Sequence, residues 1–158
     1  MVPVARRADR LAALLRQWSA APAAPSSSSW TLAHLLMFDS VHGRWDHQAE
    51  VDGDHMVIDG RRVRVTHNRS IAETDWSGCD VVLESSGAMK TVEKLQAYLD
   101  QGVGRVVVSA PVKEAGVRNI VLGVNEDVFD PATDRIVTAA SCTTNCLAPV
   151  VKVIHENL

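Results

Sequence analysis

Residues 140–146 of this chain, Ala-Ser-Cys-Thr-Thr-Asn-Cys, bring two thiols together with hydroxyl and amide side chains. The run opens a segment in which apolar residues recur at helical spacing, so we expect a helix over 141–158 with Ser141 as its N-cap. The first turn of a helix offers unpaired backbone N–H groups and the positive end of the helix dipole, which favour a nucleophilic thiolate. Cys142 is therefore a candidate nucleophile, and its polar neighbours argue against an inert buried cysteine.

An apolar stripe is expected on one face of this helix, and a proline lies inside it. Pro149 lacks an N–H group and crowds the preceding turn, so we expect it to loosen the first turns of the helix. The side chains of the expected stripe are Leu147, Val150, Val151 and Ile154.

The elements that must position Cys142 have the pattern of an α/β fold. Continuous apolar runs at 80–83 and 105–108 predict buried strands, and the segment between them predicts a helix over 90–100 that stops at Gly102. Strand, helix and strand so close together predict a βαβ unit in a parallel sheet covered on both faces. Further short strands are expected at 120–122 and 135–137.

Between residues 50 and 66, apolar and polar residues alternate, which is typical of strands with one buried face. Asp59 and Gly60 stand between two apolar runs there, and both central residues of a type I′ turn need positive φ, so this pair predicts a β-hairpin. Before the hairpin we expect a short helix capped by Thr31 and a loop at 39–43. The expected buried side of that helix consists of Leu32, Leu35 and Leu36.

The first 29 residues differ in composition from the rest, with arginines among alanines and leucines followed by a stretch of Pro, Ala and Ser. This composition is similar to that of an organellar transit peptide. We favour a simpler interpretation, in which one helix over 8–18 is followed by a disordered linker.

Composition excludes several classes of function. A net charge of −3 over 158 residues leaves no basic surface for nucleic acid. No apolar run approaches the ~18 residues that a membrane span needs, so no membrane interaction is expected. An odd count of three cysteines, with no secretory segment, favours free thiols in a reducing cytoplasm. A zinc site needs about four ligands, and no second ligand pair accompanies Cys142 and Cys146, so no metal is expected.

The run 140–149, Ala-Ser-Cys-Thr-Thr-Asn-Cys-Leu-Ala-Pro, closely resembles the active-site signature of phosphorylating (type I) glyceraldehyde-3-phosphate dehydrogenases. Further segments in the family's order extend the resemblance over 30–158. These segments are 31–36, 39–44, 80–84, 107–111 and 123–125. Residues 44–45, 110–114 and 137–140 are similar to the branch of the family that is associated with arsenate resistance. By this resemblance the chain is identified as a member of the family, as an amino-terminal fragment.

The resemblance implies a glycolytic oxidoreductase with a Rossmann-like NAD-binding domain. It implies that Cys142 attacks the carbonyl carbon of a phosphorylated aldehyde, that hydride passes to NAD, and that phosphate or arsenate releases the acyl group from the Cys142 thioester. It places Ser141 and Thr143 against the substrate or the attacking phosphate. The cofactor contacts that it implies are Arg69, Ser86, Gly87 and Ser109. Family members are tetramers, so a homo-oligomer or a hetero-oligomer with full-length relatives is also implied.

The chain departs from the family's pattern in two places. Val4, Arg6 and Asp9 occupy the glycine positions of the Gly-x-Gly-x-x-Gly turn, where side chains block the close approach of a pyrophosphate. The family's general base is a histidine well downstream of the cysteine, beyond this sequence. His155 lies roughly 20 Å along the helix from Cys142, at ~1.5 Å per residue, and cannot replace it. We therefore expect this chain alone to be inactive.

Two other functions stay open. One is a non-catalytic remnant or interaction module that assembles with a full-length relative. The other is a redox thiol protein that uses Cys142 and Cys146, although a bridge across one helical turn requires partial unwinding. The predicted division of the chain is a degenerate helix and linker at 1–29, an NAD-binding-like domain at 30–141 that is incomplete at its first strands, and the start of a catalytic domain at 142–158.

Overall fold

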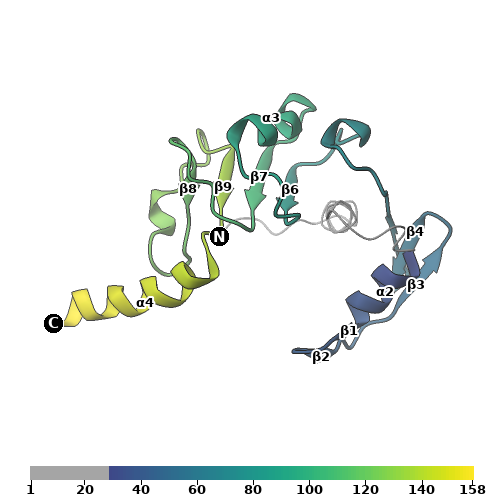
Figure 1. Cartoon of the computed structure of the whole chain (residues 1–158), viewed down its shortest axis with the longest axis horizontal. Coiled ribbons are helices and arrows are strands. Elements are labelled where there is room, and N and C mark those ends of the chain that lie inside the picture. The colour runs from purple at the N-terminus through teal and green to yellow at the C-terminus, as the bar shows by residue number, and fades with distance from the viewer. Residues whose placement is uncertain (1–28) are drawn as a thin grey trace. The chain divides into compact units, whose positions relative to one another are not determined.

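The computed structural model describes residues 29–158, and the helix and linker predicted before them lie outside the described residues. The chain divides into two compact units, 1–74 and 75–158, which are described one at a time (Figure 1). The division falls inside the predicted 30–141 domain, whose functional boundaries stay a prediction. Every helix within 29–158 is too short or too polar to span a lipid bilayer.

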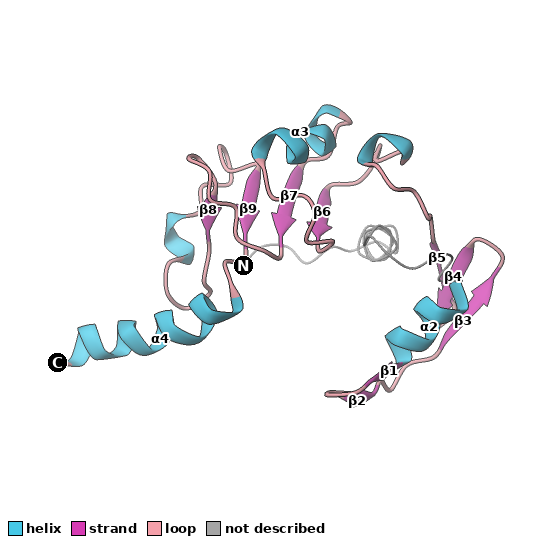
Figure 2. Ribbon diagram, in the orientation of Figure 1, coloured by secondary structure: helices cyan, strands magenta, loops and turns pink. Residues whose placement is uncertain are grey.

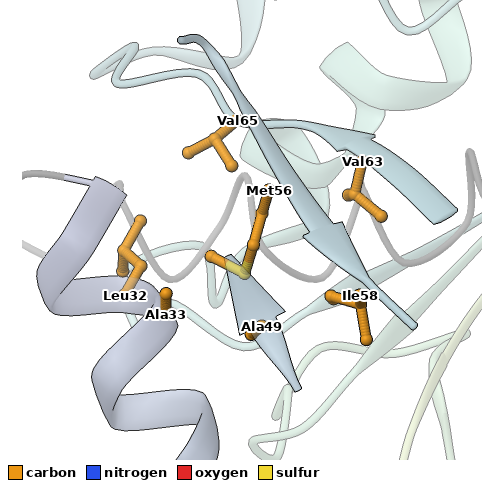
Figure 3. Packing of buried hydrophobic residues seen from close by; sticks show 7 residues of the cluster. All are labelled: Leu32, Ala33, Ala49, Met56, Ile58, Val63 and Val65. Carbon is orange, nitrogen blue, oxygen red and sulfur yellow. The ribbon is translucent and has the colours of Figure 1, made fainter. Parts of the chain in front are cut away.

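The core of the first unit, in its described part, is a helix packed on a small antiparallel sheet. Helix α2 (Ser29–Met37) packs against strands β3 (Ala49–Asp52) and β4 (His55–Ile58), and β5 (Arg61–Arg64) completes the sheet beside β4. Met56 of β4 is fully buried in the core between helix and sheet (Figure 3). The other buried side chains of this core are Leu32, Ala33, Ala49, Ile58, Val63 and Val65.

Helix α2 begins earlier than predicted. It starts at Ser29, so Thr31 lies inside the helix and its predicted role as N-cap is wrong. Leu32 is buried as expected, but Leu35 is 44% exposed. Ala33 is buried beside Leu32 instead, because the face of the helix that packs on the sheet does not include Leu35.

The predicted hairpin is confirmed. Strands β4 and β5 pair in antiparallel register, with Ile58 opposite Arg61. Asp59 and Gly60 between them have φ values of 48° and 78°, the positive values that a type I′ turn needs. The Asp59 carboxylate also accepts a hydrogen bond of 3.3 Å from the backbone N–H of Gln48, which links the turn to the start of β3.

A tight turn between two short strands lies at 39–43, where a loop was predicted. Two-residue strands β1 (Phe38–Asp39) and β2 (Gly43–Arg44) pair in antiparallel register around it. The Oδ1 atom of Asp39 accepts the backbone N–H groups of His42 at 2.7 Å and Val41 at 2.8 Å. These bonds, with the one from His42 contributing most, hold the pKa of the Asp39 carboxyl below its usual value because they stabilise the charged form.

The second unit contains a four-stranded sheet in the order β6-β7-β9-β8, and every neighbouring pair is parallel (Figure 2). The predicted α/β class with a Rossmann-like parallel sheet is therefore confirmed. In chain order the strands are β6 (Val81–Glu84), β7 (Arg105–Val108), β8 (Arg118–Asn119) and β9 (Ile136–Thr138). Helix α3 (Val92–Asp100) joins β6 to β7, is capped by Thr91, and buries Leu95 and Tyr98. Gly102, with a φ of 88°, follows the helix as predicted.

The strand predicted at 120–122 is wrong. Strand β8 ends at Asn119, and the chain then turns because the backbone N–H of Val121 donates to Oδ1 of Asn125 at 2.7 Å. Gly123, with a φ of 82°, lies within this turn. The apolar residues 120–122 therefore belong to a turn. The side chain that stabilises this turn, Asn125, follows the apolar run in the sequence.

Helix α4 (Cys142–Asn157) follows β9, which lies one residue later in the chain than predicted (Figure 2). Ser141 is confirmed as its N-cap, since the Ser141 hydroxyl accepts the N–H of Thr144 at 3.1 Å. The helix continues without a break through Pro149, so loosened first turns are not observed. No residue of α4 is buried, and the predicted apolar stripe is exposed. Two short 3-10 helices complete the described elements, η1 (Ile71–Glu73) and η2 (Glu126–Val128).

Candidate active site at the carboxyl edge of the parallel sheet

Three neighbouring parallel strands bring most of the predicted site residues to one edge of the second unit. The loop after β6 holds Ser86 and Gly87. Ser109 follows β7, the strand between the other two, and Cys142 follows β9 after a short corner. Neighbouring strands lie about 4.8 Å apart, so the candidate nucleophile and three candidate cofactor residues are on adjoining segments. Open α/β sheets bind their ligands at this edge.

Glu84, the last residue of β6, is a buried carboxylate that organises this edge. It is 1% exposed, and its Oε1 atom accepts the backbone N–H of Ser86 at 2.7 Å and the Ser86 hydroxyl at 2.5 Å. Its Oε2 atom accepts the hydroxyl of Tyr98 at 2.9 Å, and its backbone oxygen accepts the N–H of Ser109 at 2.9 Å. One residue thereby connects the loop after β6, helix α3 and the loop after β7.

The hydrogen bonds of Ser86 limit what its side chain can offer a ligand. Its hydroxyl hydrogen is donated to Glu84, and its oxygen accepts the N–H of Ala88 at 3.1 Å. Gly87 and Ser109 are exposed. Gly87 has a φ of 73°, and a Cβ atom there would meet nothing within 4 Å, so the surface in front of the loop is open. The hydrogen bonds of Ser86 therefore hold the loop, and the predicted cofactor contacts of Ser86, Gly87 and Ser109 stay a prediction.

Cys142 is exposed at the first position of α4, beside a cluster of hydroxyl groups. The Ser141 hydroxyl lies 3.0 Å from that of Thr143 and 2.7 Å from that of Thr144. Hydroxyl and backbone donors at a helix N-terminus suit an anionic group such as phosphate. Cys146 is also exposed, one helical turn later, so a disulfide between the two thiols requires unwinding of that turn.

Sequence comparisons identify the family. Residues 22–92 match the sequence model described as "Glyceraldehyde 3-phosphate dehydrogenase, NAD binding domain". Glyceraldehyde-3-phosphate dehydrogenase 3 of Nostoc sp. is 50% identical over 128 residues, which cover 80% of this chain and 38% of the relative. The chain belongs to the glyceraldehyde-3-phosphate dehydrogenase family. The resemblance found in the sequence is thereby confirmed.

Other relatives give the same result. The glyceraldehyde-3-phosphate dehydrogenase of Geobacillus stearothermophilus is 44% identical over 128 residues, again 80% of this chain and 38% of the relative. The plasmid-encoded glyceraldehyde-3-phosphate dehydrogenase of Cupriavidus necator is 46% identical over 130 residues, with 81% and 38% covered. The chain thus spans 38% of the length of the curated relatives that it matches.

The matched domain implies NAD as cofactor, and the described edge of the sheet fits it in part. Gly87 leaves room for close approach, and Ser109 is exposed beside it. The altered glycine turn, with Val4, Arg6 and Asp9, lies outside the described residues, so its effect on binding stays a prediction.

Arg69 and His155 are not among the residues that directly follow the three strands. Arg69 is in the first unit, where it is exposed and its backbone N–H donates to a carboxylate oxygen of Glu73 at 3.2 Å. Its contact with the cofactor therefore stays a prediction. His155 is the only histidine in residues 75–158, and it lies near the far end of α4 from Cys142.

No motif in the sequence predicts a role for the residues that organise this edge, Glu84 above all. A signal was present, because Glu84 ends an otherwise apolar strand and a buried carboxylate needs hydrogen-bond partners. Its partner Tyr98 lies within the helix predicted over 90–100, and nothing in the helical pattern indicates a bond to Glu84. Asn145, whose amide bonds the backbone before α4, was noted only as a polar neighbour of Cys142.

Proposed function

We propose that this chain supplies the NAD-binding half and the nucleophile of a glyceraldehyde-3-phosphate dehydrogenase, which oxidises a phosphorylated aldehyde. The observation that carries the proposal is the placement of Cys142 and of three candidate cofactor residues, Ser86, Gly87 and Ser109, after neighbouring parallel strands. Relatives that share this part of the chain bear the name of that enzyme. The chain spans 38% of the length of those relatives. The reaction of the whole enzyme is therefore part of the proposal.

The chemistry of the proposed reaction starts at the Cys142 sulfur. The thiolate attacks the carbonyl carbon of the aldehyde, a C–S bond forms, and the carbonyl π electrons move to oxygen, which takes up the proton lost by the thiol and becomes a hydroxyl group. NAD, when bound, would supply the hydride acceptor for this carbon, and loss of the hydroxyl proton with the hydride would leave a Cys142 thioester. An oxygen of inorganic phosphate then attacks the thioester carbon, and the C–S bond breaks to return the thiolate. The hydroxyl groups of Ser141 and Thr143 support binding of the substrate or phosphate beside this sulfur.

A general base must take the substrate hydroxyl proton as hydride leaves. Within residues 75–158 the only histidine is His155, roughly 20 Å along α4 from Cys142 at ~1.5 Å per residue. Hydrogen-bond reach is about 3 Å, so His155 cannot serve. We therefore propose that this chain alone does not turn over, and that activity requires the remaining catalytic part of the enzyme.

A chimaera tests this proposal. Residues 1–158 would be joined to the remaining catalytic part of the Nostoc relative, and NADH formation measured with glyceraldehyde-3-phosphate, NAD and phosphate. We expect no NADH from the chain alone and turnover from the chimaera. Turnover should be lost in Cys142→Ser and retained in the matched Cys146→Ser variant.

Two failures would have different meanings. A folded chimaera that binds NAD but yields no NADH would contradict the assignment of Cys142 as nucleophile. A chimaera that does not bind NAD would instead place the defect at the altered glycine turn, and glycine at positions 4, 6 and 9 should then restore binding.

The acceptor and the compartment form part of the same proposal. The similarity of residues 44–45, 110–114 and 137–140 to the arsenate-associated branch supports arsenate beside phosphate as acceptor. Comparing NADH formation by the chimaera with each oxyanion tests this point, and a rate with phosphate alone would remove arsenate. We place the protein in the cytoplasm, which is supported by the exposed free thiols of Cys142 and Cys146.

A second candidate function is favoured by the surface of α4. Its apolar stripe is exposed, with Leu147 at 63% and Ile154 at 52%, which is typical of a helix face that contacts another protein chain. On this proposal the chain assembles with a full-length relative without catalysing a reaction. Size-exclusion chromatography of the chain alone and mixed with the Nostoc relative tests it. Unchanged elution in the mixture would remove this candidate.

A further inference from the structure

The corner between β9 and α4 has a backbone conformation that its residue type does not favour. Ala140 has a φ of 58°, in the left-handed region where a Cβ atom crowds the backbone. In the described part of the chain, Asp59 is the only other non-glycine residue with positive φ, and it belongs to a hairpin turn that requires it. Ala140 is 4% exposed and lies two positions before Cys142.

Hydrogen bonds hold this corner on both sides of Ala140. The N–H of Ala140 donates to the hydroxyl oxygen of Thr138 at 3.0 Å. The amide nitrogen of Asn145 donates to the backbone oxygen of Ala139 at 2.7 Å and to that of Ser141 at 2.9 Å. The peptide group between Ala139 and Ala140 and the backbone oxygen of Ser141 are therefore tied to side chains, which is the condition under which a strained conformation persists.

Asn119 of β8 fixes which way the hydrogen of the Thr138 hydroxyl points. Thr138 is 1% exposed, and its hydroxyl lies 2.6 Å from Oδ1 of Asn119. A hydroxyl has one hydrogen, and the N–H of Ala140 can only donate, so the Thr138 oxygen must accept from Ala140 and donate to Asn119. Valine at position 138 would retain the side-chain shape but remove the partner of both groups.

We propose that Thr138 and Asn145 are positioning residues that hold Ala140 in its left-handed conformation and thereby set the start of α4 and the direction of Cys142. The inference rests on the proposed role of Cys142 as nucleophile. If Ala140 relaxes to negative φ, the chain enters the helix at a different angle. The Ser141 cap is then lost, and the thiol moves away from the backbone N–H groups of the first turn.

Alkylation of the intact chain by iodoacetamide tests this inference without cofactor or substrate. Tandem mass spectrometry locates the label, so Cys142 is measured against Cys146 in the same molecule. We expect Thr138→Val to lower the ratio of the Cys142 rate to the Cys146 rate about fivefold, the factor for one lost hydrogen bond. Thr138→Ser, which retains the hydroxyl, should recover most of the ratio.

A double variant separates positioning from general packing. Glycine adopts positive φ without strain, so Thr138→Val combined with Ala140→Gly should recover the ratio even though the hydroxyl is gone. If the double variant reacts like Thr138→Val alone, Thr138 does not act through the conformation of Ala140 and the inference is overturned. An unchanged ratio in Thr138→Val would overturn it equally.

Two further variants keep the test decisive. Asn145 is exposed, so Asn145→Ala removes two bonds of the corner without emptying the core, and we expect the ratio to fall there as well. Thr74→Val is the matched control, because Thr74 is 7% exposed and accepts the amide of Asn68 at 2.9 Å in the other unit. Its ratio should stay at the wild-type value. An inactive chimaera with the expected alkylation pattern would contradict the proposed function alone.

Discussion

The parallel sheet and helix α4 of the second unit differ in the burial of their apolar residues. Val82 and Val106 in the sheet are fully buried, and helix α3, which packs against β7, buries Leu95 and Tyr98. Helix α4 also carries apolar residues at regular spacing, yet none of them is buried. The difference shows that the hydrophobic effect holds the sheet together, while α4 is held chiefly by polar groups.

The polar groups that hold α4 lie near its ends. Ser141 caps the first turn, and the ammonium group of Lys152 donates to the backbone oxygens of Gly123 at 2.9 Å and Val124 at 3.3 Å. Cys142 therefore lies at the junction between a packed element and an unpacked one. A nucleophile at such a junction depends on hydrogen bonds for its position, since side-chain packing does not supply it.

Glu84→Ala should have the largest effect on the sheet. It leaves the Tyr98 hydroxyl and the Ser86 N–H without their acceptor in a buried site, at a cost of about 3 kcal/mol. Hydrogen exchange of peptides from residues 81–108 measures this loss within the second unit. The peptides of α4 should show a smaller change, because no α4 side chain packs in this core.

The matched control is Glu93→Ala, which removes a carboxylate from the exposed first turn of α3. Its effect on hydrogen exchange should be a few tenths of a kcal/mol, through the helix dipole alone. Equal effects from Glu84→Ala and Glu93→Ala would show that the Glu84 network does not stabilise the sheet.

Gly104→Ala should be the next largest change. A Cβ atom at Gly104 would lie 2.6 Å from the backbone oxygen of Asp80, which must move for β6 and β7 to remain paired. We expect a loss of about 2 kcal/mol, the usual range for overpacking. Hydrogen exchange at Arg105, whose N–H donates to that same oxygen at 3.0 Å, should accelerate most. Gly53→Ala in the first unit, where a Cβ meets nothing within 4 Å, should leave exchange in β6 and β7 unchanged.

Structural features that depend on residues close together in the sequence were predictable. The Asp59-Gly60 turn and the Ser141 cap each depend on residues within a few positions, and both are confirmed. The edge of the sheet was predictable too, because strands 80–83 and 105–108 had to end where Ser86 and Ser109 follow.

Hydrogen bonds between residues far apart in the sequence were not predictable from the pattern of apolar and polar residues. The bond between Glu84 and Tyr98 joins residues 14 apart, and that between Thr138 and Asn119 joins residues 19 apart. The first depends on how α3 packs on the sheet and the second on the register of β8 and β9, and the apolar runs alone specify neither. The strand predicted at 120–122 failed for the same reason, since β8 pairs with β9 through Asn119 and the residue before it.

Ser141→Ala tests the local stabilisation of α4. Loss of the cap removes the acceptor of the Thr144 N–H, and we expect about 1 kcal/mol of local destabilisation. Hydrogen exchange at residues 142–146 should accelerate while that of β7 stays unchanged. Ser70→Ala is the matched control, because Ser70 precedes η1 without a capping bond. A change at β7 as large as that in α4 would show that the helix and the sheet unfold together.

Leu147→Ser combined with Val150→Ser should have the smallest effect on stability. Both side chains are more than half exposed, at 63% and 54%, so the free energy of unfolding of the isolated chain should change by less than about 0.5 kcal/mol. Val106→Ser in the sheet is the matched control and should abolish cooperative unfolding of the second unit, since Val106 is fully buried. If the exposed face contacts another chain, the serine pair should also weaken co-elution with the Nostoc relative. A large loss of stability in the isolated chain would instead show that α4 buries this face within the chain, and the contrast between helix and sheet would no longer hold.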